Sequence, residues 1–250
     1  MLGRLFGRKV PQTPSQVPPG TRVYAIGDIH GRADLLKEIN QLIHEDAYER
    51  QAPRNVVVYL GDYIDRGPDS RGVIDRFLDA PLPGFEIVHL VGNHEDSLLR
   101  FLDDLQIGPS WLDYGGDKTL HSYGVAPPDP NSTRDLLRAQ AELHRALPQR
   151  HLEFYRSLQL SCVEGDYFFV HAGVRPGVAL AQQSPDDLIW IRSEFLHSGA
   201  EFGKIIVHGH SITALPEVRR NRIGIDTGAY HSGKLTALVL EGEEFAFLQT

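Results

Sequence analysis

The sequence predicts an α/β fold, and three observations support that prediction. Three segments in the first half of the chain have the order strand, glycine-containing loop, helix. Their strand segments are continuously apolar, which is typical of parallel strands buried on both faces. The second half of the chain has the pattern of successive strands, so a second sheet packed on the first is the most economical architecture.

Composition narrows the class of protein. The 250 residues, 41% of them hydrophobic, allow one large domain or two small ones, and we favour one. The formal charge of −8 and the lack of a basic stripe argue against nucleic acid as a partner. Cys162 is the only cysteine, which excludes an intrachain disulfide or a cysteine-rich zinc site and fits a cytoplasmic setting. No apolar run is long enough for a membrane span, and "MLGRLFGRK" lacks the apolar region of a signal peptide.

The N-terminal segment differs in composition from the rest. "VPQTPSQVPPG" is rich in Pro, Ser and Gln and ends in a Pro-Pro-Gly breaker, so residues 1–20 are predicted to form a flexible tail. The first residues, with apolar side chains beside basic ones, would suit a short membrane-touching turn, but a frayed, solvated terminus is the better interpretation, so no stable membrane association is expected. The remainder, residues 21–250, is predicted to be a single domain.

The elements follow in order along the chain. "RVYAIG" is strand-like, and "ADLLKEINQLI" places Leu35, Ile39, Leu42 and Ile43 on one helical face. "NVVVYL" leads through Gly61 to a helix around "SRGVIDRFLDA", and "FEIVHLV" leads through Gly92 to the helical "DSLLRFLDDL". Because loops that follow parallel strands open on one edge of a sheet, the three loops should lie together.

Residues 108–150 interrupt this alternation and are predicted to be an insertion. "GPSWLDYGGDKTLHSYG" is loop-like, and "STRDLLRAQAELHRAL" begins with a Ser/Thr cap before a helical pattern. After the insertion, "LQLSCVEGDYFFVHAGV" predicts a hairpin that turns at residues 164–166. Four more strands are expected in "KIIVHGH", "RIGIDTG", "KLTALVLE" and "EFAFLQ".

Each of the first three strands ends in a glycine followed by groups that bind metals: "GDIHG", "GDYIDRG" and "GNHE". The glycine permits a tight turn, so that a short Asp or Asn side chain can point to a common centre. His171 in "FFVHAG" and His208 and His210 in "IIVHGH" follow later strands and should reach the same edge. Mixed carboxylate, imidazole and amide ligands suit manganese, iron or zinc better than magnesium or calcium.

The ligands outnumber what one ion needs, which favours two divalent ions. Asp62, on the central strand of the three motifs, is the expected bridge, and a metal pair can clamp both oxygens of a phosphoryl displacement. A single such motif is equally well explained by a capping Asp or a hydrogen-bonded His, but three in register argue against that reading. The other histidines are interpreted as structural: His44, His144 and His151 as solvated surface, and His89 as a core residue.

The three motifs, together with "VHAGV" and "VHGH", resemble the signature of the phosphoprotein phosphatase family of calcineurin-like dinuclear metallophosphoesterases. The resemblance runs from about Arg22 to the C-terminus and implies a four-layer αββα sandwich with two mixed β-sheets. It implies two metal ions, with manganese expected first and iron or zinc as alternatives. The ligands that it implies are Asp28, His30 and Asp62 for one ion, and Asp62, Asn93, His171 and a His of "VHGH" for the other. His210 matches the last position better than His208.

The resemblance also assigns catalytic roles. His94 matches the general acid that protonates the leaving oxygen, and Asp65 matches the carboxylate that orients it. Arg66 matches a phosphate-binding guanidinium, Arg192 in "LIWIRSEF" is the candidate for a second one, and Asn93 is expected to contact the phosphate as well as a metal. Tyr230 lies where some members carry a Tyr beside the site, and its role stays open. "WLDYGGDKTLHSYG" looks more like the bacterial serine/threonine phosphatases of the family.

The expected function is hydrolysis of phosphomonoesters, first of all phosphoserine or phosphothreonine in proteins. In-line attack by a metal-bridging hydroxide is expected, because divalent metals bring the pKa of water from ~15.7 to about 7. The alternative enzyme is a bacterial symmetrical dinucleoside polyphosphate hydrolase, which would cleave diadenosine tetraphosphate to ADP. A third hypothesis, an inactive metal-stabilised scaffold, is disfavoured because every expected ligand and the acid are present. The sequence does not indicate an oligomeric state.

Overall fold

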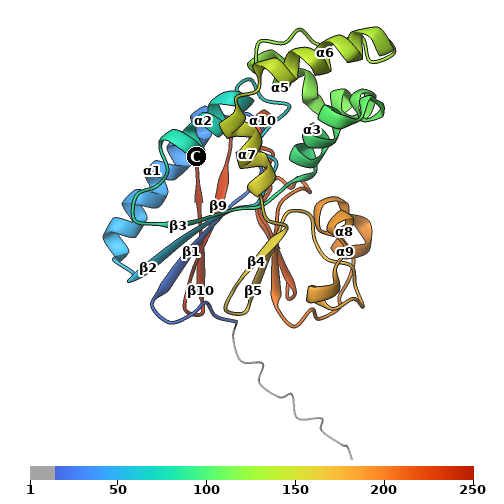
Figure 1. Ribbon diagram of the computed structural model, residues 1–250. Helices are drawn as coiled ribbons and strands as arrows, with labels where there is room; N and C mark the ends of the chain where they lie inside the picture. Colours follow the sequence, from blue (N-terminus) through green and yellow to red (C-terminus); the bar gives the residue numbers. More distant parts are fainter. Residues whose placement is uncertain (1–14) are drawn as a thin grey trace, which may run out of the picture.

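Two five-stranded mixed sheets form the centre of the computed structural model, which describes residues 15–250 (Figure 1). The first sheet has the order β10-β9-β1-β2-β3, with β1, β2 and β3 parallel and β9 and β10 antiparallel to their neighbours. Its strands are β1 (Thr21–Ile26), β2 (Arg54–Tyr59), β3 (Glu86–His89), β9 (Thr236–Glu241) and β10 (Glu244–Gln249). The three consecutive parallel strands predicted from the sequence are therefore confirmed.

The second sheet has the order β4-β5-β6-β8-β7. β5, β6 and β8 are parallel, and the edge strands β4 and β7 are antiparallel to their neighbours. Its strands are β4 (Ser161–Glu164), β5 (Tyr167–Val170), β6 (Ile205–His208), β7 (Glu217–Val218) and β8 (Arg222–Gly224). The predicted hairpin is the β4–β5 pair, in which Glu164 lies opposite Tyr167.

Alternation along the strands produces the layers. In β1, Val23 and Ala25 pack against the second sheet, whereas Tyr24 and Ile26 pack against helices on the outer face. In β5, Phe169 faces the first sheet and Phe168 faces the helices that cover the second. Each sheet is thus buried on both faces, as parallel strands require. The predicted four-layer αββα sandwich is confirmed.

Helices follow the parallel strands and cover the outer faces. The face of α1 that packs on the first sheet contains Leu35, Leu36, Ile39 and Ile43, all buried, and the helix ends at Gln51 in the left-handed conformation. The helices outside the insertion are α1 (Ala33–Arg50), α2 (Ser70–Asp79), α3 (Asn93–Asp103), α8 (Pro185–Trp190), α9 (Ser193–Leu196) and α10 (Ala229–Ser232).

The insertion is more helical than the sequence predicted. Its elements are η1 (Leu105–Ile107), α4 (Gly108–Trp111), the π-helical turn η2 (Leu112–Gly116), α5 (Asp117–Ser122), α6 (Thr133–Ala146) and α7 (Gln149–Ser157). The prediction of a loop after Gly108 is therefore wrong. Trp111 and Leu120 are fully buried and hold short helices against the domain. The predicted cap is confirmed, because the Ser132 hydroxyl accepts from the amide of Asp135.

The N-terminal boundary is also corrected. The predicted tail extended to residue 20, but residues 15–20 contact the domain. Val17 is 1% exposed within the apolar layer between the sheets, and its amide donates to the carbonyl of Gly242 at 3.1 Å. This apolar side chain and the hydrogen bonds of Gln16, Val17 and Gly20 attach the polar segment to the domain. The rest of the predicted tail, residues 1–14, lies outside the described residues. Among residues 15–250 no helix has the length and apolarity to cross a bilayer.

Candidate active site

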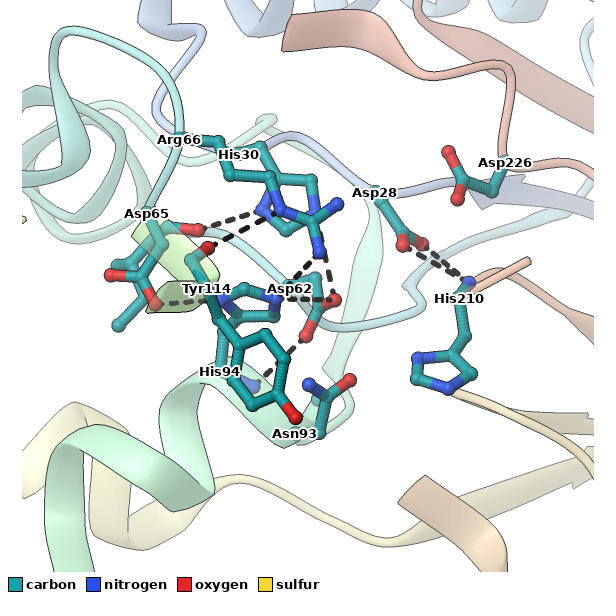
Figure 2. Close-up of polar contacts among 12 residues, drawn as sticks. Asp28, His30, Asp62, Asp65, Arg66, Asn93, His94, Tyr114, His210 and Asp226 are labelled. Carbon is teal, nitrogen blue, oxygen red and sulfur yellow. Dashed lines mark hydrogen bonds and ion pairs between the residues drawn. The ribbon is translucent and has the colours of Figure 1, made fainter. Parts of the chain in front are cut away.

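The predicted site residues meet at the carboxyl ends of the parallel strands (Figure 2). Asp28 and His30 follow β1, Asp62 follows β2, and Asn93 begins α3 immediately after the β3 loop. From the second sheet, His171 follows β5 and His210 follows β6. Six of the predicted metal-binding side chains are thereby brought together, and all are buried: Asp28, His30, Asp62, Asn93, His171 and His210.

The backbone of these loops is unusual. Of the six non-glycine residues with positive φ in the described chain, five are predicted site residues: His30, Asp62, Asp65, Arg66 and His210. Non-glycine residues adopt this conformation at a cost and typically do so at functional sites. It turns several predicted ligands and phosphate-binding groups toward one centre.

Two glycines make room for the carboxylates. A Cβ atom on Gly92 would lie 2.1 Å from Oδ1 of Asp62, and one on Gly209 would lie 2.0 Å from Oδ1 of Asp28. Any side chain at either position would therefore displace a carboxylate. The sequence analysis interpreted Gly92 only as a turn former and gave Gly209 no role, because the room that they leave for the carboxylates is visible only in the packing.

Two groups of His and Asp side chains are close enough to hold a metal ion each. One contains His30, Asp62 and His94, and the other contains Asp62, His171 and His210, with the ligand atoms of each within 4.8 Å of one another. Asp62 belongs to both, as expected of a bridging ligand. His94, predicted to be the acid, takes part in the first group, whereas the Asp28 carboxylate accepts from the backbone amide of His210 at 3.0 and 3.1 Å.

The protonation and orientation of the imidazoles suit a cation. The Nδ1 atoms of His30 and His171 lie 2.8 and 2.9 Å from the carbonyls of Ile64 and Leu60, which directs both Nε2 atoms inward. Burial lowers the pKa of His30 well below its ordinary value, and burial lowers the pKa of His210 to about 2. Neutral imidazole is the form that binds metals.

Unsatisfied buried atoms provide a direct test of fit. At this centre the Nε2 atom of His30 and the Oδ2 atom of Asp226 are buried without a hydrogen-bond partner. Buried polar atoms normally have partners, so such orphans at one centre indicate an absent ligand. Carboxylates and imidazoles around a shared Asp62 fit divalent cations of the manganese, iron or zinc type. The residues present therefore fit the metal ions that the fold family implies.

Asp226 is a site residue that the sequence analysis missed. It is 1% exposed, and burial together with the charge of Asp226 raises the pKa of Asp28. A buried pair of carboxylates is stabilised by a shared proton or cation. The available signal was "GIDTG", in which an acidic residue closely follows an apolar strand, as Asp28 and Asp62 do.

His94 is held by Asp65 from one side. Its Nδ1 lies 2.6 Å from Oδ2 of Asp65, and its Nε2 lies 3.7 Å from Oδ2 of Asp62 and 3.2 Å from Nη2 of Arg66. Burial opposes the charged imidazole, but the charge of Asp62 and the hydrogen bond to Asp65 outweigh burial and raise the pKa of His94. The protonated imidazole, which a raised pKa favours, is the form that donates a proton.

Two residues of the insertion, also missed from the sequence, hold Asp65 in turn. The indole Nε1 of Trp111 donates to Oδ2 of Asp65 at 2.9 Å, and the hydroxyl of Thr119 donates to Oδ1 at 2.5 Å. Asp65 is fully buried, so these donors compensate its desolvation. The insertion is therefore part of the site rather than a peripheral addition.

Glu95 lies in the first turn of α3 and joins two loops. Its carboxylate accepts from the amides of Asp62 at 2.9 Å, Tyr63 at 2.7 Å and Gly92 at 2.9 Å. Burial and the charge of Asp62 raise its pKa to about 7. It belongs to neither His/Asp group, and its contacts position the loop that presents Asp62.

The two predicted phosphate-binding arginines line one cavity of about 560 Å³ beside His210. Nη1 of Arg192 donates to the carbonyl of His210 at 3.2 Å. The guanidinium of Arg66 lies 5.1 Å from the centre of the Tyr230 ring, and that ring lies 5.5 Å from the ring of His30. Tyr230, whose role the sequence left open, is therefore beside the site.

His208 points elsewhere. Its Nε2 lies 3.3 Å from Nη1 of Arg222, and its Nδ1 contacts the carbonyl of Gly209. His208 ends β6 and faces the helical side of the second sheet, where its ring packs on Phe195. His210 lies beyond the strand with φ +61°, so strand alternation no longer sets its direction. Of the two histidines in "VHGH", His210 is the one that joins Asp62 and His171.

Comparisons with known proteins agree with this geometry. Residues 21–237 match the family model of the calcineurin-like phosphoesterases. Proteins named bis(5′-nucleosyl)-tetraphosphatase PrpE [asymmetrical] are similar: that of Oceanobacillus iheyensis is 25% identical, with 90% of each chain covered, and that of Bacillus thuringiensis is 28% identical, with 85% of this chain and 88% of the relative covered.

Solved structures share the fold. One, provisionally named a diadenosine tetraphosphatase, has a TM-score of 0.63 at 18% identity and covers 95% of this chain and 98% of its own. A cold-active protein tyrosine phosphatase of a psychrophilic Shewanella has a TM-score of 0.56 at 16% identity, covering 94% of this chain and 82% of its own. From the family match over most of its length and from the site built on Asp62, the chain belongs to the calcineurin-like phosphoesterase family.

Proposed function

We propose that this chain is a divalent-metal-dependent hydrolase that cleaves dinucleoside tetraphosphates asymmetrically, into a nucleoside triphosphate and a nucleoside monophosphate. The observation that carries phosphoester chemistry is the pair of His/Asp groups sharing Asp62 beside a cavity lined by Arg66 and Arg192. The support for a nucleotide substrate is the name of the curated relatives, which match most of this chain. Manganese is the proposed ion, with iron or zinc as alternatives.

The proposed ligands are the six side chains predicted from the sequence. Asp28, His30 and Asp62 would hold one cation, and Asp62, Asn93, His171 and His210 the other. Bound divalent cations supply Lewis-acid polarisation of the phosphoryl oxygens and lower the pKa of water. The chain itself holds these ligands in place. Backbone carbonyls orient the rings of His30 and His171, and the Glu95 carboxylate holds the backbone amide of Asp62.

Arg66 and Arg192 are the proposed phosphate-binding groups. A tetraphosphate bridge carries several negative charges, and a planar guanidinium binds phosphate oxygens in pairs. As phosphorus is attacked, charge spreads over its equatorial oxygens, and arginines already in place stabilise that charge without reorganisation. Asn93 is proposed to bind a cation and also to contact the phosphate. Its Oδ1 lies 3.0 Å from Nε2 of His171.

His94 is the proposed proton donor to the leaving oxygen, and Asp65 keeps it oriented. The need for this proton depends on the leaving group. A phosphate leaving from an anhydride departs readily, whereas a serine or threonine alkoxide requires protonation. The buried His94–Asp65 pair therefore favours a second candidate function, the hydrolysis of phosphoserine or phosphothreonine in proteins, which the sequence predicted first.

Product analysis decides between these functions. The manganese-loaded enzyme is incubated with diadenosine tetraphosphate and, separately, with a phosphoserine peptide, and products are separated by chromatography. ATP and AMP in equal amounts support asymmetrical cleavage. ADP alone would instead support the symmetrical cleavage expected from the sequence, and exclusive release of phosphate from the peptide would support the second candidate. Asp62→Asn is the control, in which every metal-dependent product should disappear.

A further inference from the structure

The turn η2 of the insertion forms one wall of the cavity and carries two side chains with no assigned role. Asp113, Tyr114 and Gly115 of this turn line the cavity together with Arg66 and Arg192. Both Asp113 and Tyr114 are exposed, Tyr114 by 44%. An aromatic ring and a carboxylate add nothing to the binding of phosphate, so their place beside two arginines requires another explanation.

The Tyr114 ring lies beside two other rings and remains accessible. The Tyr114 ring lies beside His94 (Figure 2), with ring centres 6.2 Å apart. The centre of the Trp190 ring is 6.0 Å away. Trp190 in turn lies 6.4 Å from the ring of His210. An exposed ring beside other rings is a platform on which a planar base can stack.

The platform is tied to a phosphate-binding arginine. The carbonyl of Tyr114 accepts from Nε of Arg66 at 3.4 Å, and the carbonyl of Gly115 accepts from the amide of Arg66 at 3.2 Å. These contacts join the backbone of the turn to Arg66 and so limit the distance between the ring and the guanidinium. A limited distance suits a ligand that presents a base and a phosphate at a constant separation.

The carboxylate of Asp113 is unpaired. Among residues 15–250 it makes no ion pair and its side chain makes no hydrogen bond, although two arginines line the same cavity. A free carboxylate repels phosphate but accepts hydrogen bonds from hydroxyl groups, and in dinucleotide-binding proteins an acidic residue binds the ribose hydroxyls in this way.

We propose that Asp113 and Tyr114 form a nucleoside-binding subsite, in which the Tyr114 ring stacks on the base, Asp113 accepts from the ribose hydroxyls, and Arg66 holds the attached phosphate. This inference rests on the proposed action on nucleotides and identifies the residues that select them over phosphorylated proteins. No bond is made or broken in the subsite, and its effect is on affinity.

A ladder of inhibitors tests the subsite without requiring that the natural substrate be known. Inorganic phosphate, ribose 5-phosphate and AMP are compared as competitive inhibitors of p-nitrophenyl phosphate hydrolysis by the manganese-loaded enzyme. Stacking on an aromatic side chain changes affinity by roughly tenfold or more, so the inhibition constant of AMP should be about tenfold lower than that of ribose 5-phosphate. Ribose 5-phosphate should have a lower inhibition constant than inorganic phosphate, and Asp113→Asn should remove most of this difference.

Variants of Tyr114 separate stacking from folding. Tyr114→Ala should reduce the advantage of AMP over ribose 5-phosphate to within about twofold, and Tyr114→Phe should keep it, since the ring is retained. Tyr48→Ala and Asp103→Asn, on exposed residues that do not line the cavity, are matched controls and should leave the ladder unchanged.

Two results would overturn the subsite: AMP that inhibits the wild-type enzyme no better than phosphate, or a Tyr114→Ala variant that keeps the AMP advantage. Equal weakening of AMP and of a phosphoserine peptide by Tyr114→Ala would also overturn it, because the ring would then serve peptide binding. Failure of the proposed function is a separate result, namely no cleavage of diadenosine tetraphosphate by an enzyme that still shows the AMP ladder.

Discussion

Nδ1 of His94 lies 2.6 Å from Oδ2 of Asp65, and neither side chain reaches solvent, with exposures of 1% and 0%. The contact fixes the imidazole so that its other nitrogen faces Asp62. The proposed role of His94 as a proton donor rests on this buried carboxylate, which stabilises the protonated ring.

The first prediction concerns the leaving group. His94→Gln should lower kcat for a phosphoserine peptide by ~10² to 10⁴, the usual contribution of a general acid. It should lower kcat for p-nitrophenyl phosphate much less, because nitrophenolate leaves without a proton. Steady-state rates on both substrates, with His44→Gln on the exposed face of α1 as control, check this. Equal losses on both substrates would exclude the acid role.

The second prediction concerns Glu95, whose carboxylate joins the loops after β2 and β3. Glu95→Gln places an amide donor against backbone amides, so the free energy of unfolding should fall by about 1–3 kcal/mol. The metal ions should also dissociate faster, since Asp62 loses its support. Urea unfolding and chelator competition measure the two effects. The exposed Glu49→Gln is the control, and unchanged metal release in Glu95→Gln would refute the positioning role.

The third prediction uses two glycines with positive φ. Gly115 has φ +103° and a Cβ there would lie 2.8 Å from the amide nitrogen of Arg66, whereas Gly124 has φ +79° with nothing within 4 Å. Alanine at either position introduces backbone strain of roughly 1–2 kcal/mol, but only Gly115→Ala should displace Arg66. The inhibition constant of inorganic phosphate should therefore rise in Gly115→Ala and stay unchanged in Gly124→Ala. A similar rise in both variants would count against the contact.

The fourth prediction is a pH effect on stability at His89. Burial among aromatic side chains lowers the pKa of His89 to about 4. A folded-state pKa below the unfolded value means that the unfolded chain binds the proton first. Stability contributed by this residue is present above pH ~6.5 and is lost as the pH falls toward 4.

At pH 5 the loss amounts to about 2 kcal/mol. His89→Phe keeps the ring packing and removes the titration. Between pH 7.5 and pH 5 the free energy of unfolding should therefore fall by about 2 kcal/mol less in this variant than in the wild-type protein. Urea unfolding at both pH values measures the difference, with exposed His44→Phe as control. Identical pH dependence of His89→Phe and the wild-type protein would show that His89 does not titrate in this way.

The sequence predicted most of the site because its residues directly follow apolar strands. Asp28, Asp62 and Asn93 each come after a strand and a glycine, and parallel strands bring their ends to one edge. The partners of Asp65 could not be found in this way. Trp111 and Thr119 lie in a segment with no periodic pattern, and only tertiary packing brings them to Asp65.

Local composition also gave wrong predictions of solvent exposure where burial depends on a few residues. His151 was expected on the solvated surface because its helix is rich in charges, yet it is fully buried, with Nδ1 2.8 Å from the hydroxyl of Tyr123 and Nε2 3.0 Å from Asp75. Its helix α7 buries His151, Phe154 and Tyr155 on one face. The same limit applies to Val17, whose side chain helps to attach a polar segment to the core.

The central claim is that two divalent cations share Asp62. Anomalous diffraction from a manganese-loaded crystal tests it directly. The account predicts two anomalous peaks, one contacting His30 and Asp62 and the other contacting Asp62, His171 and His210. A single peak, or two peaks of which one has no contact with Asp62, would contradict it.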